Sequence, residues 1–154
     1  MKCYGKRFLS VLFIIATICS FLCISASAAT ESSAYIDSYR ATVVPESRGY
    51  LTVTGEVDAV SPMTKLGVSL IYLYESTDGS LFDRVATYTP VAHPHLMGSG
   101  LSYDRDFITY RGTPGRYYYA SVYFYAEDET GSDEKNYITA VRQAVATAPD
   151  SDYD

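Results

Sequence analysis

Residues 112–126 show the clearest alternation of apolar and polar positions in the chain, with a period of two residues that predicts a β-strand. We expect one face of this strand to pack in the core, namely Tyr118, Ala120, Val122, Phe124 and Ala126. The other face carries Tyr117, Tyr119, Ser121, Tyr123 and Tyr125. A phenol combines an apolar ring with a polar tip, so this second face tolerates water. The stretch therefore predicts a central strand with one buried face and one tyrosine face.

Six further strand patterns, separated by turn residues, occupy most of the remaining chain. We expect these strands, in chain order, at 35–44, 50–60, 66–75, 81–89, 101–110 and 136–145. A turn at 61–64 should separate the second strand from the third, and the irregular stretch 90–100 should cross between sheets. The third strand changes phase at residues 69–70, which predicts a bulge, and Gly55 indicates a bulge or a close backbone approach.

Seven antiparallel strands within residues 34–145 predict a single all-β domain, an immunoglobulin-like or fibronectin-like β-sandwich. The segment Gly115-Arg116-Tyr117 resembles a tyrosine corner, in which a phenol hydrogen-bonds back across the corner. In the fourth strand we expect Val85 to point inward. Residues 29–33 form a small polar lead-in, and the small and acidic residues 146–154 predict a flexible tail.

The first 28 residues have the pattern of a secretory signal peptide. A basic start precedes an almost unbroken apolar run at 8–24, and small residues follow at 26–28. We expect a signal-peptide helix that is cleaved after Ala28 or Ala29, a secreted mature chain, and no contact with a membrane after cleavage. An uncleaved membrane anchor is the alternative, because the apolar run is long enough for it.

Removal of the signal peptide changes the composition. All three cysteines, Cys3, Cys19 and Cys23, lie within it, so the mature chain has no disulfide and no thiol chemistry. A cysteine-free exported domain fits Gram-positive-type secretion better than a eukaryotic disulfide scaffold. Of the 12 Lys and Arg residues, 3 lie in the signal peptide, which leaves 9 against 18 Asp and Glu, a net charge near −9. Such an acidic surface repels nucleic acid and anionic lipid, so we expect neither as a partner.

Four segments carry a resemblance to a known group of proteins: Leu66-Gly67-Val68, Ile71 to Tyr74, Gly112 to Gly115, and Ala120 to Ala126. Together they make the chain similar to a family of small secreted Gram-positive bacterial proteins of unknown function. The resemblance covers most of the mature chain. It implies a β-sandwich and an exported protein, and it carries over no activity, cofactor or catalytic residue.

Tyrosines are the most unusual feature of the composition. Fifteen of the 16 tyrosines lie in the mature chain, which has no tryptophan. The outward row predicted as a binding site consists of Tyr117, Tyr119, Tyr123 and Tyr125. If a neighbouring strand places Tyr72 or Tyr74 beside this row, the result is a flat aromatic face of the kind that binds glycans, peptides or protein surfaces. The alternative is that the opposite sheet covers the row and the two faces are inverted.

His93 and His95 flank Pro94, and two imidazoles at this spacing can bind zinc or copper on an extended backbone. A third ligand would come from Asp104 or Asp106, and the same four residues are the candidates for a small hydrolase. The alternative for the histidines is a solvated loop. For the two aspartates it is a charged strand side that discourages pairing with other chains.

The acidic segment 127–134 contains the oxygen ligands that calcium prefers, with Asp128, Asp133 and Glu134 as the candidates. The segment departs from the helix-loop-helix calcium motif, because its residues before Gly131 do not match and helices do not flank it. A hairpin loop kept soluble by its charge is the alternative.

Three functions follow from these features. The first is a secreted, non-catalytic binding module whose tyrosine face recognises cell-surface glycan or protein, without a cofactor. The second is a hydrolase that uses His93 or His95 with Asp104 and Asp106. The third is an envelope protein stabilised by calcium. The chain lacks cysteine outside the signal peptide and has no Gly-x-Ser-x-Gly turn, so we expect it not to be an enzyme. The oligomeric state is left open.

Overall fold

The computed structural model describes residues 33–147. The predicted signal peptide, nearly all of the lead-in and residues 148–154 of the tail lie outside this range. The described elements are β1 (Ile36–Pro45), the 3-10 turn η1 (Ser47–Gly49), β2 (Tyr50–Ser76), β3 (Asp83–Tyr88), the 3-10 turn η2 (Pro94–Leu96), β4 (Met97–Arg111), β5 (Tyr117–Glu127), β6 (Ser132–Ile138) and β7 (Arg142–Gln143). Within the described range, no helix has the length and apolar character needed to cross a membrane.

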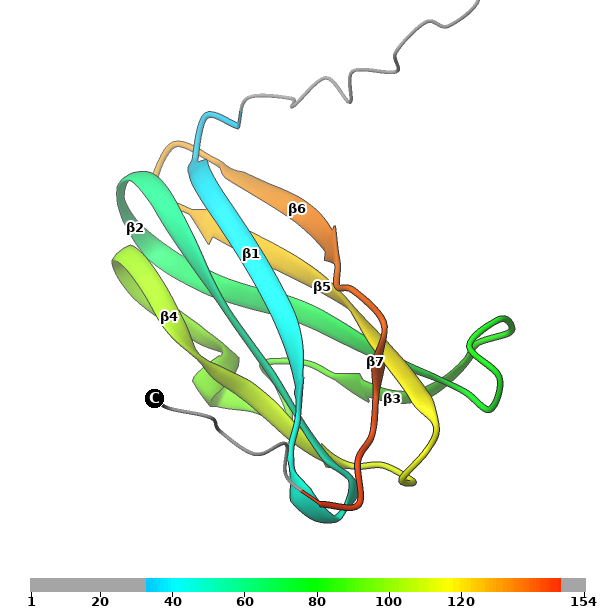
Figure 1. The fold of residues 1–154 in the computed structure, drawn as a ribbon. Helices are drawn as coiled ribbons and strands as arrows, with labels where there is room; N and C mark the ends of the chain where they lie inside the picture. The colour runs from blue at the N-terminus through cyan, green and yellow to red at the C-terminus, as the bar shows by residue number, and fades with distance from the viewer. Residues whose placement is uncertain (1–32, 148–154) are drawn as a thin grey trace, which may run out of the picture. The chain divides into compact units, whose positions relative to one another are not determined.

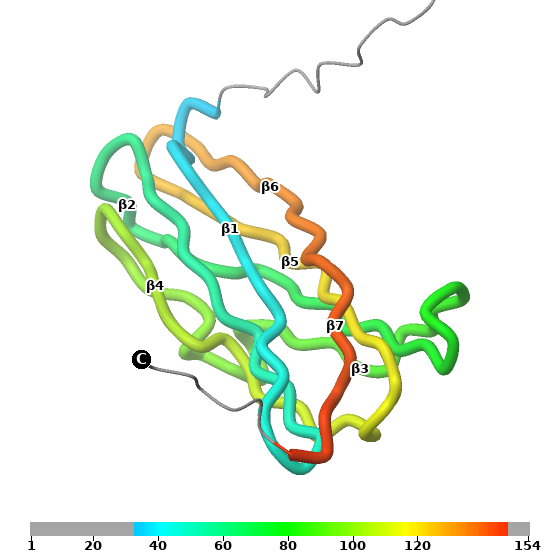
Figure 2. Tube along the Cα trace, in the orientation of Figure 1, coloured from blue at the N-terminus to red at the C-terminus, as the bar shows by residue number. Residues whose placement is uncertain are grey.

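All seven strands between residues 33 and 147 join one antiparallel sheet, built on the long strand β2 (Figure 1). The first half of β2, residues 50–59, hydrogen-bonds to β1 on one side and β4 on the other. Its second half, residues 65–76, pairs with β5 along its length and with β3 along residues 71–75. β6 and β7 extend the sheet beyond β5. The trace of β2 therefore passes from one half of the sheet to the other (Figure 2).

The sheet is curled into a half-barrel, so both halves turn one face toward a common core. The predicted core face of β5 is confirmed, since Tyr118, Ala120, Val122, Phe124 and Ala126 are all fully buried. Phe124 meets the other half of the sheet through Phe107 of β4, with ring centres 6.0 Å apart, and through Tyr39 of β1 at 5.6 Å. The predicted all-β, antiparallel class is confirmed, with the strands joined in a single sheet.

The predicted turn at 61–64 does not separate two strands. The chain turns back at this point (Figure 1), but β2 continues through Pro62 to Ser76. Its ladder with β4 loses register between Asp58 and Met63 and again between Met63 and Leu66. A proline has no N–H to give to a ladder, which fits a segment where pairing is already interrupted. The turn signal therefore marks a bend that lets one strand serve both halves.

The predicted bulge at residues 69–70 is confirmed, because the ladder between β2 and β5 shifts register between Val68 and Leu70. Val68 is buried before the shift and Ile71 after it, so both segments face the core. Gly55 also behaves as expected. A side-chain carbon there would collide with the carbonyl oxygen of Arg40 and lie 2.9 Å from the Cα of Ala41.

Other strand boundaries differ from the predictions. Val85 is 39% exposed, not inward, because the ladder between β2 and β3 slips at this point and leaves it without a core position. The last predicted strand at 136–145 begins four residues earlier, at Ser132, since the acidic turn spans only residues 128–131. β4 begins at Met97, within the stretch predicted to be irregular.

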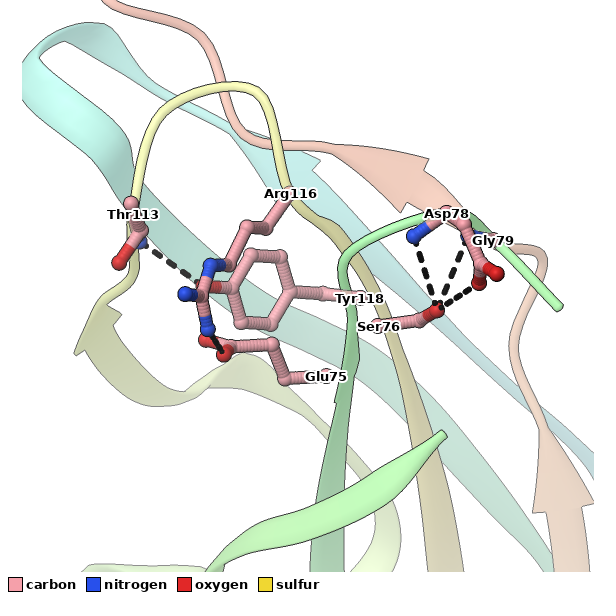
Figure 3. A network of polar contacts seen from close by, with 7 residues as sticks. All are labelled: Glu75, Ser76, Asp78, Gly79, Thr113, Arg116 and Tyr118. Carbon is pink, nitrogen blue, oxygen red and sulfur yellow. Dashed lines mark hydrogen bonds and ion pairs between the residues drawn. The ribbon is translucent and has the colours of Figure 1, made fainter. Parts of the chain in front are cut away.

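A polar network around Tyr118 fixes the start of β5 (Figure 3). The Tyr118 hydroxyl accepts a 2.8 Å hydrogen bond from the backbone N–H of Thr113 and donates to Oε2 of Glu75. The guanidinium of Arg116 pairs with the other carboxylate oxygen, Oε1. The ring passes so close to Gly112 that a side-chain carbon there would lie 2.7 Å from it. The predicted corner therefore exists, but Tyr118 forms it instead of Tyr117.

The hairpin after β2 lies beside this network (Figure 3). Ser76 donates a 2.9 Å hydrogen bond to Oδ1 of Asp78 and accepts another from the backbone N–H of Gly79. The Tyr117 ring packs against Gly79, at 3.6 Å from where a side-chain carbon would be. This position explains why Tyr117 is not the corner residue, because its ring points away from the core.

The buried corner predicts a loss of stability in alkali. Burial, followed by the hydrogen bond to Glu75, raises the pKa of Tyr118 to about 12, from 10.0. A raised pKa means that folding favours the neutral phenol, so this contribution is complete below pH 10 and disappears as the pH rises toward 12. Between pH 9 and pH 12, the free energy of unfolding should fall by about 2–3 kcal/mol less in Tyr118→Phe than in wild type. Urea denaturation at the two pH values measures this difference. In the control Tyr50→Phe, whose phenol lies outside this network, the free energy of unfolding should fall over this pH range by as much as in wild type. A smaller fall in this control would contradict the assignment to Tyr118.

The two faces of β5 predict unequal costs of truncation. Phe124 is fully buried, so Phe124→Ala should lower the free energy of unfolding by about 3–5 kcal/mol. Tyr123 is its half-buried neighbour on the opposite face, and Tyr123→Ala should lower the free energy of unfolding by only about 1 kcal/mol. Equal losses in urea denaturation at pH 7 would show that the assignment of the faces is incorrect.

Candidate functional site

Five aromatic side chains form one contiguous group on the side of β2 and β5 that faces away from the core. We call this group the aromatic face; its members are Tyr72, Tyr74, Phe82, Tyr119 and Tyr123, and all are half-buried. The rings of Tyr74 and Tyr119 stack at 4.7 Å with an interplanar angle of 9°. The neighbouring pairs meet edge-on, with Phe82 to Tyr119 at 4.9 Å, Tyr72 to Tyr123 at 6.0 Å and Tyr72 to Tyr74 at 6.4 Å.

Register places these rings together. Tyr74 lies directly opposite Tyr119 in the ladder between β2 and β5. Just before the bulge in β2 the even-numbered residues Leu66 and Val68 face the core, but beyond it the odd-numbered residues face it. The extra residue therefore turns Tyr72 and Tyr74 away from the core, onto the face that carries the tyrosines of β5. The structure places Tyr72 and Tyr74 beside the tyrosines of β5, which is the condition that the sequence analysis set for a flat aromatic face.

Polar groups are interleaved with the rings. The guanidinium carbon of Arg84, on β3, lies 4.8 Å from the centre of the Tyr72 ring. On the β6 side, the amide of Asn136 donates a 2.8 Å hydrogen bond to the Ser121 hydroxyl. The rings thus have hydrogen-bonding groups on both flanks.

The other two predicted tyrosines lie at the ends of β5. Tyr117 packs on the hairpin at Gly79, whereas Tyr125 donates a hydrogen bond to the carboxylate of Glu127. That hydrogen bond, together with the one from Lys65, holds the pKa of Glu127 below its usual value. Within the row, burial and the neighbouring Tyr74 raise the pKa of Tyr119, so its hydroxyl stays protonated at neutral pH.

Three of the four residues considered for a hydrolase line one cavity. His93, His95 and Asp106 line a cavity of about 320 Å³, together with Tyr88, Phe107, Ile108 and Thr109. Asp104 lines a different cavity, of about 280 Å³, with Arg40 and Glu56.

The carboxylates considered for calcium have separate partners. Oδ1 of Asp128 accepts hydrogen bonds from the hydroxyl and N–H of Thr130 and from the N–H of Gly131, at 2.6, 2.7 and 3.1 Å. These bonds lower the pKa of Asp128, with the Thr130 hydroxyl as the largest cause. Asp133 pairs with Lys135 at 3.4 Å, and Glu134 accepts a 2.6 Å hydrogen bond from the Ser69 hydroxyl. Among residues 33–147, no three His, Cys, Asp or Glu side chains form a group able to hold a metal ion.

Sequence reasoning missed two members of this surface. Phe82 had no assigned face and Arg84 no assigned role, but both contact the tyrosines. Their positions depend on the register of β3 against β2, which slips between Leu73 and Tyr74. The one available signal is the hairpin sequence, which places residues 82–84 beside the end of β2.

No protein-family model, curated protein or solved structure matches this chain. The resemblance to small secreted Gram-positive proteins therefore stays a prediction.

The geometry of the acidic turn predicts a weak response to calcium. Since Oδ1 of Asp128 already accepts three hydrogen bonds within its own turn, a cation would have to displace them. We expect the melting temperature to change by less than about 1 °C in 5 mM calcium chloride. A ligand stabilises the folded protein only if its concentration is well above its dissociation constant. A larger rise that Asp128→Asn abolishes would restore the calcium hypothesis.

Proposed function

We propose that this protein is an exported, non-catalytic binding module whose aromatic face recognises uncharged glycan chains. The observation that carries the proposal is the contiguous group of five half-buried rings across two adjacent strands. Single exposed aromatic residues are common on protein surfaces, whereas a continuous patch of them is typical of an interaction site.

The chemistry of the face favours sugars. A sugar ring presents an apolar C–H face, which stacks on an aromatic ring, and a rim of hydroxyls, which need hydrogen-bonding partners. Here the rings of Tyr74 and Tyr119 supply the stacking surface, and the Arg84 guanidinium flanks it with donors. On the other flank, the amide N–H groups of Asn136 bond to Ser121 and Val122, so this side chain offers its oxygen as an acceptor. The ring contacts also hold the tyrosines in place before a ligand arrives, and such preorganisation lowers the entropic cost of binding.

Charge favours an uncharged ligand. The chain after residue 28 carries a net charge near −9, from 9 basic and 18 acidic side chains, so polyanionic glycans are repelled at long range. A protein partner is the alternative occupant, since aromatic residues and arginine are also enriched in the interfaces between proteins.

Export is supported by the basic start, the apolar run at 8–24 and the small residues at 26–28. For the architecture we propose the two-layered arrangement of an immunoglobulin-like sandwich, joined at one side through β2. It is supported by the common core of the two halves and by the Tyr118 corner. Membership of the small Gram-positive family is part of the same proposal.

Binding of the mature chain to an array of neutral and acidic glycans, followed by titration of the best neutral ligand, tests the proposal. In Tyr74→Ser/Tyr119→Ser two stacked rings are lost, each worth about 0.5–1.5 kcal/mol, so affinity should fall roughly 5- to 100-fold. The matched control is Tyr50→Ser, which removes a tyrosine with its own guanidinium neighbour, Arg111 at 5.9 Å, on the other half of the sheet.

Circular dichroism must first show that all three proteins unfold cooperatively. Equal loss of affinity in the Tyr50 control, or retained affinity in the double variant, would place the site elsewhere. Binding restricted to acidic glycans, or to no glycan at all, would remove the neutral-glycan proposal and leave a protein surface as the candidate partner.

A further inference from the structure

The cavity between β3, η2 and β4 holds both histidines of the chain. It lies apart from the aromatic face and does not depend on the proposed function. The loop that carries the histidines is fixed by its backbone. The N–H of His93 donates to the carbonyl of Thr89 at 2.8 Å, and the carbonyl of His95 accepts the hydroxyl of Tyr103. Between them and β4, Leu96 is fully buried and anchors the turn.

A hydrogen bond sets the tautomer of His95. Its Nε2 lies 2.7 Å from the carbonyl oxygen of Phe107. A carbonyl only accepts, so Nε2 must carry the proton, which leaves the lone pair on Nδ1. The carbonyl is available because β4 is irregular at this point: its ladder with β2 passes from Ile108 to Asp106 and skips Phe107. Histidines that bind metals usually donate their second N–H in this manner, to a carbonyl or carboxylate.

The two imidazoles are at chelating distance. The ring centres of His93 and His95 are 5.8 Å apart and the planes are nearly perpendicular, at 83°. With metal–nitrogen bonds of about 2.0–2.1 Å, two imidazoles that share a tetrahedral or distorted tetrahedral ion have centres roughly 5–6 Å apart. Asp106 lines the same cavity and adds a carboxylate.

We propose that His93 and His95 chelate a divalent transition-metal ion, of the copper or zinc class, in this cavity, with Asp106 as the neighbouring negative charge. The site is open: the two imidazoles are the protein ligands, and water fills the remaining positions. This arrangement agrees with the finding that no three candidate ligands among residues 33–147 converge on one point. Imidazole is a good ligand for copper and zinc, and the acidic chain attracts cations.

The test is copper binding by the mature chain, prepared without a histidine tag. Because the chain has only two histidines, electron paramagnetic resonance of the Cu²⁺ complex can count imidazole nitrogens directly. We expect one equivalent of Cu²⁺ with coupling to two imidazole nitrogens. His93→Gln should reduce the coupling to one nitrogen and weaken the affinity measured by calorimetry at least tenfold.

Two variants make the test specific. Asp106→Asn should weaken copper binding severalfold, whereas Asp104→Asn, in the other cavity, should leave it unchanged. A melting temperature close to that of wild type confirms that each variant folds. Coupling to fewer than two imidazole nitrogens in wild type, or equal affinity in wild type and His93→Gln, would overturn the proposal.

Discussion

Residues 65–76 of β2 hydrogen-bond to β5 on one side and, over part of their length, to β3 on the other, and the ladder with β5 is interrupted between Val68 and Leu70. This interruption decides what the molecule presents to solvent. Immediately before it, the even-numbered residues Leu66 and Val68 of β2 fill the core; after it, the odd-numbered residues Ile71 and Leu73 do. Without the extra residue Tyr72 and Tyr74 would be core residues, and the aromatic face would be a single row on β5.

Much of this arrangement could be predicted because the sequence of β5 alternates clearly between residues of its core face and residues of its opposite face. Every core position between Tyr118 and Ala126 is apolar or, in Tyr118, a phenol with buried partners, and four of the five opposite positions are tyrosines. The bulge in β2 was predictable for a similar reason, since apolar residues change parity there. Period-two patterning carries this information within a single strand, without knowledge of the neighbours.

The features that escaped prediction depend on contacts between segments distant in sequence. Pro62 is a turn residue by its chemistry, but β4 follows the chain past it and keeps β2 a single strand. The corner residue was displaced by one position, because Glu75 lies opposite Tyr118 in the ladder. The grouping of His93, His95 and Asp106, without Asp104, depends on the irregularity of β4 at Phe107.

The order in which β2 meets its partners has a consequence for biosynthesis. Residues 65–76 of β2 pair with residues 117–127 of β5, so this half of the sheet cannot assemble until most of the chain has been synthesised. Pairing across such long sequence separations is slow. A polypeptide threaded through a translocation channel from its N-terminus would therefore remain unfolded during passage and close into its final form only after β5 has emerged.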